Sequence, residues 1–189
     1  FLDNRVWYYY KSKDNLAIGW EYIDGSWYYF NDKGKMLVGW INDNENMYYL
    51  NSSGAMTTDW QYINGAWYYM NSSGAMCTGW LFINNVWYYF DHDGKMAIGW
   101  KNINSNWYYF NTNGEMVTGW LNLGGIWYYL NENGSMITGW QFVNGAWYYF
   151  NNDGDMAVGW LNLGGIWYYL YSDGSMATGW VFDNNVWYL

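Results

Sequence analysis

Proline is absent from this chain of 189 residues, and cysteine and histidine occur once each, as Cys77 and His92. A single cysteine excludes an internal disulfide, which is expected where repetition rather than cross-linking supplies stability. One histidine and one cysteine, without counterparts elsewhere in the chain, also provide no nucleophile–base pair. The sequence therefore predicts a non-catalytic protein that needs no cofactor.

Charge is scarce as well, and most of it is negative. Charged residues make up 12% of the chain, 7 residues are Lys or Arg, and the net charge is −9. A phosphate backbone requires many cationic side chains, and so does an anionic lipid surface. Nucleic acids and anionic membrane surfaces are therefore excluded as partners, whereas the negative field is compatible with a cationic ligand.

Long apolar runs are also missing from the sequence. No run reaches the length of about 18 residues that a membrane span needs, so no direct membrane insertion is predicted. No signal peptide opens the chain, but the chain starts and stops inside a repeat. We therefore expect residues 1–189 to form a single module that is a fragment of a longer protein.

Aromatic residues are abundant, at 26% of the chain, with 18 Trp and 23 Tyr. A chain this rich in rings must bury them in a regular way or use them as a binding surface. The tryptophans recur at intervals of about twenty residues without an insertion, which is the signature of stacked repeats. The first series is Trp20, Trp40, Trp60, Trp80, Trp100, Trp120, Trp140, Trp160 and Trp180. The second series is Trp7, Trp27, Trp67, Trp87, Trp107, Trp127, Trp147, Trp167 and Trp187, interrupted by Met47.

Each repeat reads as a β-hairpin followed by a tight polar connector. The stretches 80–83 and 87–90 are short and rich in β-favouring residues. Turn dipeptides such as Asp24-Gly25 separate the two stretches and favour a two-residue type I′ turn. Polar segments ending in glycine follow the second stretch, as in residues 51–54. The glycine spacing and the lack of a 3.6-residue apolar period exclude helices.

A two-residue turn also predicts which side chains share a face of the hairpin. It places Tyr22 opposite Trp27 and Trp20 opposite Tyr29, with all four rings on one side of the ribbon. An isolated hairpin is marginally stable in water, so each one must pack on its neighbours. The other side of the ribbon carries Ile23, Tyr28 and Phe30, and the Tyr28 series and Ile23 are predicted to be structural core.

The repeated motif is Gly-Trp at 79–80, Trp-Tyr-Tyr at 87–89 and Gly-Lys-Met at 94–96. It resembles the choline-binding repeats, or cell-wall-binding repeats, of Gram-positive surface proteins and phage lysins, and the resemblance covers essentially the whole chain. It implies an all-β fold, a β-hairpin solenoid in which about nine repeats form a left-handed superhelix with about three hairpins per turn. Related repeats occur in glucan-binding and clostridial toxin proteins, so a carbohydrate-binding module is the alternative.

The resemblance implies that ligands bind between successive hairpins. Each cage consists of both Trp residues of one repeat, a Tyr from the next and a Met beside them. The six implied sets are Trp20, Trp27, Tyr49 and Met36; Trp60, Trp67, Tyr89 and Met76; Trp80, Trp87, Tyr109 and Met96; Trp100, Trp107, Tyr129 and Met116; Trp120, Trp127, Tyr149 and Met136; and Trp140, Trp147, Tyr169 and Met156.

Three positions depart from this pattern. Met47 replaces the second Trp of a doubtful seventh site, whose members would be Trp40, Met47, Met56 and Tyr69. Trp160 and Trp167 are expected to lack a partner, because the implied Tyr position is Leu189. Trp7 has no preceding Trp in this chain, and Leu16 stands where a Met is expected.

The chemistry of a quaternary ammonium group explains why such a cage suits choline. This group donates no hydrogen bond, but it spreads a positive charge over methyl groups that aromatic faces attract. Each ring contributes about 0.5–1 kcal/mol when exposed and about 2 when desolvated. Affinity per site is therefore modest, and a polymer that occupies several sites gains avidity. The implied partner is choline or phosphocholine on teichoic and lipoteichoic acids, which predicts a secreted protein at the bacterial cell wall and surface. Self-association as a dimer through the array ends stays open.

Three other interpretations compete with choline binding. Sugars also stack on Trp and Tyr, but the repeat offers few polar side chains at constant positions beside the rings. Residues 91–94 resemble the start of a calcium loop, yet the equivalent segments 51–54 and 71–74 contain no carboxylate, so a polar turn explains them all and no metal site is predicted. A stiff spacer rod would not require two intact Trp series.

Overall fold

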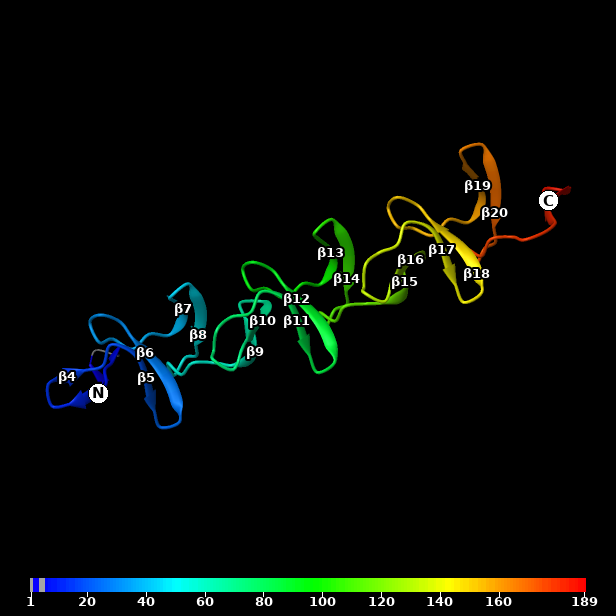
Figure 1. Ribbon diagram of the computed structural model, residues 1–189. Coiled ribbons are helices and arrows are strands. Elements are labelled where there is room, and N and C mark those ends of the chain that lie inside the picture. Colours follow the sequence, from blue (N-terminus) through cyan, green and yellow to red (C-terminus); the bar gives the residue numbers. More distant parts are fainter. Residues whose placement is uncertain (1, 4–5) are drawn as a thin grey trace. The chain divides into compact units, whose positions relative to one another are not determined.

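The computed structural model describes residues 2–3 and 6–189, with side chains described from residue 6 onward (Figure 1). In this described part every regular element is a β-strand, and there is no helix long and apolar enough to cross a membrane. The chain divides into two compact units, the N-terminal unit Phe1–Ala97 and the C-terminal unit Ile98–Leu189. The predicted all-β class of hairpin repeats, typical of β-hairpin solenoids, is confirmed.

The strands of the N-terminal unit are β1 (Leu2–Asp3), β2 (Val6–Trp7), β3 (Tyr10–Ser12), β4 (Asn15–Leu16), β5 (Gly19–Ile23), β6 (Ser26–Phe30), β7 (Gly39–Asp43), β8 (Asn46–Leu50), β9 (Asp59–Ile63), β10 (Ala66–Met70), β11 (Gly79–Ile83) and β12 (Val86–Phe90). Those of the C-terminal unit are β13 (Gly99–Ile103), β14 (Asn106–Phe110), β15 (Gly119–Leu123), β16 (Ile126–Leu130), β17 (Gly139–Val143), β18 (Ala146–Phe150), β19 (Gly159–Leu163), β20 (Ile166–Leu170), β21 (Val181–Asp183) and β22 (Val186–Tyr188). The strands pair two by two in chain order, β1 with β2, β3 with β4 and so on to β21 with β22, and each pair forms an antiparallel two-stranded sheet.

The hairpin register follows from the turn. In β5–β6, Trp20 pairs with Tyr29 and Tyr22 pairs with Trp27, as predicted. Asp24 and Gly25 have φ values of 48° and 86°, which suit a type I′ turn and match the right-handed twist of the strands. The two Trp residues of a repeat therefore lie diagonally on one face of the hairpin.

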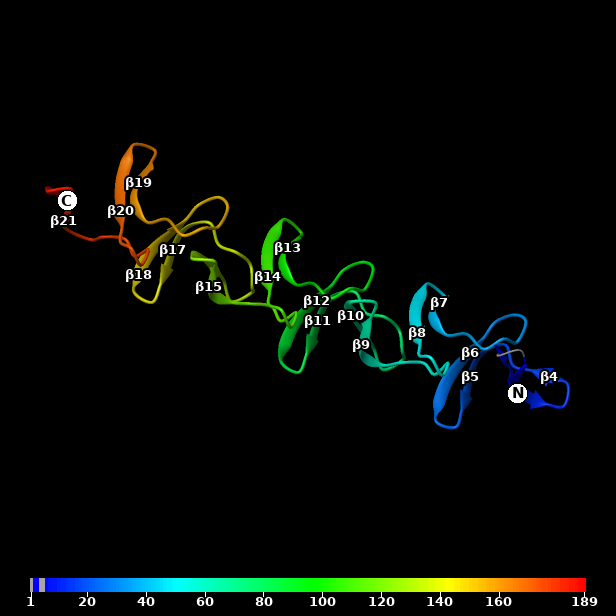
Figure 2. The same cartoon turned by 180° about the vertical axis from the view of Figure 1, so that it is seen from behind.

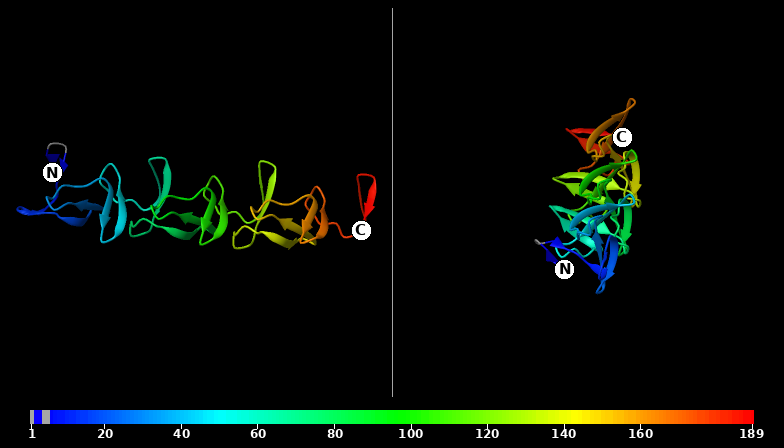
Figure 3. Two further views of the ribbon diagram at one scale, coloured as in Figure 1. Left: turned by 90° about the horizontal axis from the view of Figure 1, so that it is seen from above. Right: turned by 90° about the vertical axis from the view of Figure 1, so that its left-hand side faces the viewer.

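Successive hairpins within each unit project in different directions. Figures 1 and 2 show this from opposite sides for β5–β6, β7–β8 and β9–β10, and Figure 3 shows it again in the C-terminal unit. Backbone hydrogen bonds join neighbouring repeats. The N–H groups of Met36, Met56, Met96, Met136, Met156 and Met176 each donate to the carbonyl of the second Trp one repeat earlier, and Met76 donates to Met47 at the same position. The N···O distance is 2.8 Å for Met56 to Trp27 and also 2.8 Å for Met136 to Trp107.

The connectors are polar turns in which a side-chain oxygen accepts hydrogen bonds from backbone N–H groups of the turn. The Asn51 side-chain oxygen accepts hydrogen bonds from the backbone N–H groups of Ser53 and Ala55, at 2.9 and 3.2 Å. In segment 91–94, Asp93 instead pairs with Lys95 at 2.8 Å, and the Lys95 hydrogen bond is the main reason that the pKa of Asp93 is lowered. Among the described residues, no group of three or more His, Cys, Asp or Glu gathers as a metal site would require.

The core of each unit is a column formed by the last residue of the second strand. Its members are Phe30, Leu50, Met70 and Phe90 in the N-terminal unit and Phe110, Leu130, Phe150 and Leu170 in the C-terminal unit, all at most 2% exposed. Each of them pairs with the residue that opens its hairpin, which is a glycine in every case except Met70, whose partner is Asp59. The described side chains include no buried polar or charged residue. The rings of the Trp pairs are left at the edges of this column, where they can form walls of cavities.

Candidate functional site

Cavities of one design lie between successive hairpins in both units. The Trp20 cavity, of about 330 Å³, is lined by Trp20, Trp27, Tyr48, Met56, Ser72 and Ser73. The Trp100 cavity, of about 260 Å³, is lined by Trp100, Trp107, Tyr128, Met136, Asn152 and Asp153. The Trp120 cavity, of about 280 Å³, is lined by Trp120, Trp127, Tyr148, Met156 and Asp173. Each cavity thus combines two indoles, one phenol and one thioether with polar connector residues.

The rings of a cavity form an open corner. In the Trp120 cavity the two indoles lie 6.0 Å apart between centroids and are nearly perpendicular, at 88°. The Tyr148 ring closes a third side at 4.8 Å from Trp120. The Trp127 side chain is 43% exposed. The three rings therefore present aromatic surface to a small guest without filling the space between them.

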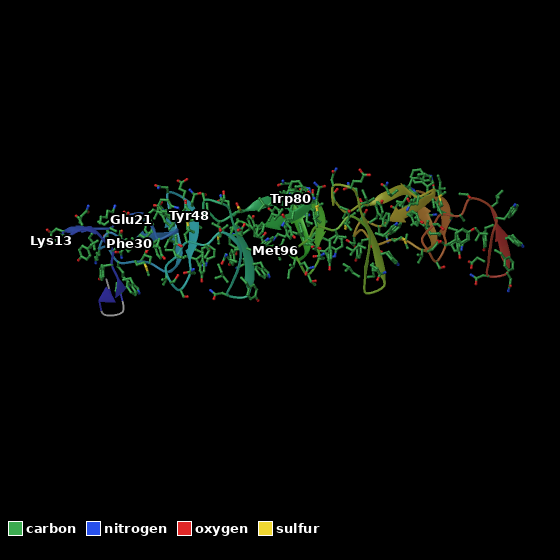
Figure 4. All side chains as sticks on the ribbon, turned by 90° about the horizontal axis from the view of Figure 1, so that it is seen from below. Lys13, Glu21, Phe30, Tyr48, Trp80 and Met96 are labelled. Carbon is green, nitrogen blue, oxygen red and sulfur yellow. The ribbon has the colours of Figure 1, made fainter. Side chains whose placement is uncertain are left out.

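Opposite faces of consecutive hairpins supply these rings. Trp120 lies on β15 and Trp127 on β16, diagonally placed on the same face of their hairpin. Tyr148 lies on β18 and pairs with Gln141, on the other face of the next hairpin. In the N-terminal unit, Tyr48 of β8 plays the same part for the Trp20 cavity (Figure 4). A cavity therefore exists only where two repeats are stacked.

The composition of these cavities corrects the sequence-based sets in two respects. Trp20 and Trp27 meet Tyr48 and Met56, not Tyr49 and Met36. Tyr49 instead packs against Trp40 of its own hairpin, with 5.1 Å between ring centroids. Other expected tyrosines show the same displacement, because each pairs with the first Trp of its own hairpin. They are Tyr89, Tyr129, Tyr149 and Tyr169.

Two physical facts explain the difference. Adjacent residues of a strand point to opposite faces, so only one residue of each Tyr-Tyr pair can face the preceding repeat. The expectation that the Tyr28 series is structural core is wrong in this respect, since its members Tyr48, Tyr128 and Tyr148 line cavities. The methionine comes from the connector of the next repeat because its backbone N–H is bonded to the second Trp of the preceding one.

The same ring arrangement surrounds Trp60 and Trp140. Trp60 lies 6.1 Å from Trp67 and 5.0 Å from Tyr88. Trp140 lies 6.4 Å from Trp147, and its second neighbour is Tyr168 at 4.9 Å. The connector methionines beside these sets are Met96 and Met176, whose N–H groups donate to Trp67 and Trp147 respectively.

Trp80 and Trp87 also have this relative orientation, at 6.1 Å and 90°. Both belong to the N-terminal unit, whereas Tyr109, which the sequence assigns to them, belongs to the C-terminal unit. The members of this set beyond the two indoles stay a prediction. Met96, assigned to the same set, lies in the N-terminal unit and bonds to Trp67.

The repeat with Met47 forms a more closed structure. Trp40 contacts Tyr68 rather than Tyr69, at 4.9 Å, and Tyr68 is only 8% exposed. Tyr68 belongs to a hydrophobic cluster in which Trp40 also packs. Met47 accepts a hydrogen bond from the Asn42 amide at 3.5 Å. One indole wall is replaced and the phenol is buried, so this doubtful site offers a ligand less aromatic surface than a cavity with two indoles.

The structure adds two sets that the sequence interpretation missed. Trp160 contacts Tyr188 at 4.7 Å, so the expectation that it lacks a tyrosine partner is wrong. A larger cavity of about 370 Å³ includes Trp7, Tyr28 and Met36 among its lining residues. The signal was available in the sequence, because the interval from Trp7 to Tyr28 equals that from Trp27 to Tyr48.

A carboxylate supports the first indole at two positions. Trp20 Nε1 donates to Asp43 at 3.1 Å, and the Tyr29 hydroxyl donates to the other Asp43 oxygen at 3.5 Å. Trp160 Nε1 donates to Asp183 at 2.9 Å in the same way. Burial, followed by the charge and hydrogen bond of Asp43, raises the pKa of Tyr29. In the other repeats that contain a first-series Trp, the equivalent residues are apolar, namely Ile23, Ile63, Ile83, Ile103, Leu123, Val143 and Leu163.

Protein-family models match the chain over most of its length. The model described as choline-binding repeat matches residues 17–59, 57–98, 97–138 and 137–162. A second model, described as putative cell wall binding repeat, matches residues 158–176 and 178–189. No curated protein matches the chain closely enough to count as a relative.

Solved structures of Streptococcus pneumoniae proteins are similar to the chain. CbpJ and choline binding protein F are each 42% identical to it, with TM-scores of 0.84 and 0.82. Either match covers 90% of this chain and 61% of the other, so the chain spans less than two thirds of those proteins. The choline-binding domain of CbpL is 34% identical, with 85% of this chain and 87% of that domain covered and a TM-score of 0.65. The match of the repeat model over most of its length shows that the chain belongs to the choline-binding repeat family.

Proposed function

We propose that this chain is a non-catalytic attachment module that holds choline groups of a bacterial surface polymer, of the teichoic or lipoteichoic acid type. The observation that carries the proposal is the recurrence of one cavity design, in which two indoles, a phenol and a methionine line a space open to solvent; the indoles are nearly perpendicular in the Trp100 and Trp120 cavities, at 87° and 88°. Perpendicular ring faces attract a methylated cation from several sides at once. Attachment of this kind places the protein outside the cell, at the cell wall.

The repetition of the cavity supports attachment to a polymer. Three rings and a thioether give a modest affinity per site after the cost of association is subtracted. Several sites on one chain, engaged by one polymer, raise the overall affinity by about 10²–10⁴. Free choline at high concentration should then release the protein from the polymer.

Titration of the chain with choline provides the first test. Millimolar choline is expected to change the Trp fluorescence and raise the melting temperature, because a ligand that binds only the folded state stabilises it. Glycerol serves as the control for solvent effects, and glucan oligomers test the carbohydrate alternative. A response to glucan oligomers together with a flat response to choline would refute the proposal in favour of sugar binding.

A pair of glycine substitutions tests whether the connector methionine is a wall of the site. Gly154 and Gly145 have φ values of 84° and 91°, so an Ala at either position adds backbone strain of about 1–2 kcal/mol. A Cβ at Gly154 would overlap the Met136 side chain, whereas a Cβ at Gly145 meets nothing within 4 Å. Met136 lines the Trp100 cavity, and the end of its flexible side chain can move aside.

Gly154→Ala should therefore weaken choline binding in the Trp100 cavity, while Gly145→Ala should not. Thermal unfolding compares the stability of the two variants, and the NMR signals of the Trp100 and Trp107 indoles report binding. If the two variants bind choline with equal affinity in this cavity, Met136 contributes nothing to the site.

A further inference from the structure

The cavities differ in the charge of the connector residue that lines them. Each cavity receives its rings and its methionine from two successive repeats, and a connector from the third repeat completes it. In the Trp20 cavity this connector supplies Ser72 and Ser73. At the register position of Ser73, the Trp100 cavity has Asp153 and the Trp120 cavity has Asp173. The aromatic part of the site is thus constant, and its rim changes between a hydroxyl and a carboxylate.

The rim carboxylate of the Trp120 cavity is held in place and ionised. Asp173 accepts hydrogen bonds from the backbone N–H and the hydroxyl of Ser175, at 3.0 and 2.6 Å. These bonds lower the pKa of Asp173, so it carries its charge at neutral pH. Ser73 forms an equally local pair, because its N–H and hydroxyl both donate to the Asn71 side chain. The two connectors are therefore similarly ordered and differ in charge.

The rim is the place where the two forms of the ligand would differ. Choline and phosphocholine share the trimethylated nitrogen that the rings enclose, so the ring contacts cannot separate them. The remaining part of the ligand must leave the aromatic corner through its open side. In choline that part ends in a hydroxyl, whereas in phosphocholine it ends in a phosphate with a charge of about −1.5 to −2 at pH 7.

We propose that the connector residue sets how strongly each cavity distinguishes these two ligands: the Trp100 and Trp120 cavities disfavour phosphocholine relative to choline, and the Trp20 cavity binds phosphocholine without this penalty. This proposal rests on the proposed function. Asp153 and Asp173 are exposed, so water screens their repulsion of a phosphate. For charges about 6 Å apart in water, Coulomb's law gives a discrimination of about three- to tenfold. Asp43 binds the N–H edge of Trp20 and is not among the lining residues of the Trp20 cavity.

The test uses the full chain with ¹⁵N-labelled indoles, which allow each cavity to be followed through its own Trp signals. Choline and phosphocholine are titrated separately at low ionic strength, and the ratio of their dissociation constants is measured for each cavity. The ratio of the dissociation constant of phosphocholine to that of choline should be about three- to tenfold higher in the Trp120 cavity than in the Trp20 cavity. Added salt should reduce this difference.

Reciprocal variants isolate the rim charge. Asp173→Asn keeps the shape of the side chain and removes its charge, so it should abolish the excess disfavour of phosphocholine in the Trp120 cavity. Ser73→Asp should introduce that disfavour into the Trp20 cavity, with Asp43 unchanged. The proposal would be overturned if the ratio of the two dissociation constants were equal in the two cavities, or if neither variant altered it. The proposed function would remain valid in that case, because choline would still bind. If neither ligand shifts any indole signal, the proposed function itself fails.

Discussion

Replacing Trp127 with Ala is expected to weaken choline binding in the Trp120 cavity by about 10- to 30-fold, since a desolvated ring contributes about 2 kcal/mol. Trp127 forms one wall of the cavity, at 88° to Trp120. Its side chain is 43% exposed, so its removal leaves the core column in place. The indole NMR signals of Trp120 measure the affected cavity, and those of Trp100 report an unaffected cavity in the same molecule.

A second aromatic truncation provides the control. Phe182 is 55% exposed and packs against Trp187, and it lines none of the cavities described above. Phe182→Ala should leave choline affinity in the Trp120 cavity unchanged. Retention on a choline-bearing matrix should fall for Trp127→Ala alone, because one of the linked sites is lost. Unchanged binding in the Trp120 cavity of the Trp127 variant would show that the ligand does not occupy this corner.

The largest effect on stability is expected from Phe150→Ala. Phe150 is 0% exposed and packs against Trp120 and Tyr129, at centroid distances of 5.8 and 6.2 Å. Truncating a buried Phe to Ala costs about 3–5 kcal/mol, because apolar contacts are lost and a cavity remains. The change should also loosen Trp120 and so weaken the ligand site, although Phe150 does not line it.

The same hairpin contains the matched control. Phe142 is 52% exposed and packs against Trp147 at a tilt, with 5.3 Å between ring centroids, so Phe142→Ala should cost about 1 kcal/mol. Hydrogen exchange of the β17–β18 amides is the appropriate measurement, because an array of repeats need not unfold in one step. If the Phe142 variant lost as much protection from hydrogen exchange as the Phe150 variant, the assignment of Phe150 to the core would be contradicted.

Local rules were sufficient to predict the hairpin from the sequence. Asp24-Gly25 determines a two-residue turn, and the turn determines that Trp20 pairs with Tyr29. The alternation of side chains along a strand then determines that Trp20 and Trp27 share a face. The period of the two Trp series predicted the stack of repeats for the same reason: each of these properties depends on residues close together in the chain.

These local rules could not predict which Tyr and which Met complete the cavity of each Trp pair. Tyr48 and Tyr49 are adjacent, identical in type and on opposite faces of β8, so either could serve a neighbouring repeat as far as the sequence shows. The rotation between successive hairpins turns Tyr48 toward Trp20, and it leaves Tyr49 against Trp40. The same rotation, together with the bond from Met56 to Trp27, selects the methionine of the following connector.

The sequence alone therefore determined the repeat, the hairpin register and the pair of indoles that opens each site. Only the tertiary structure decided which phenol, which thioether and which rim residue complete it. The physical reason is that turns and strand alternation act within one repeat, whereas the walls of a cavity come from three repeats whose relative orientation depends on the packing of core residues such as Phe30 and Phe150.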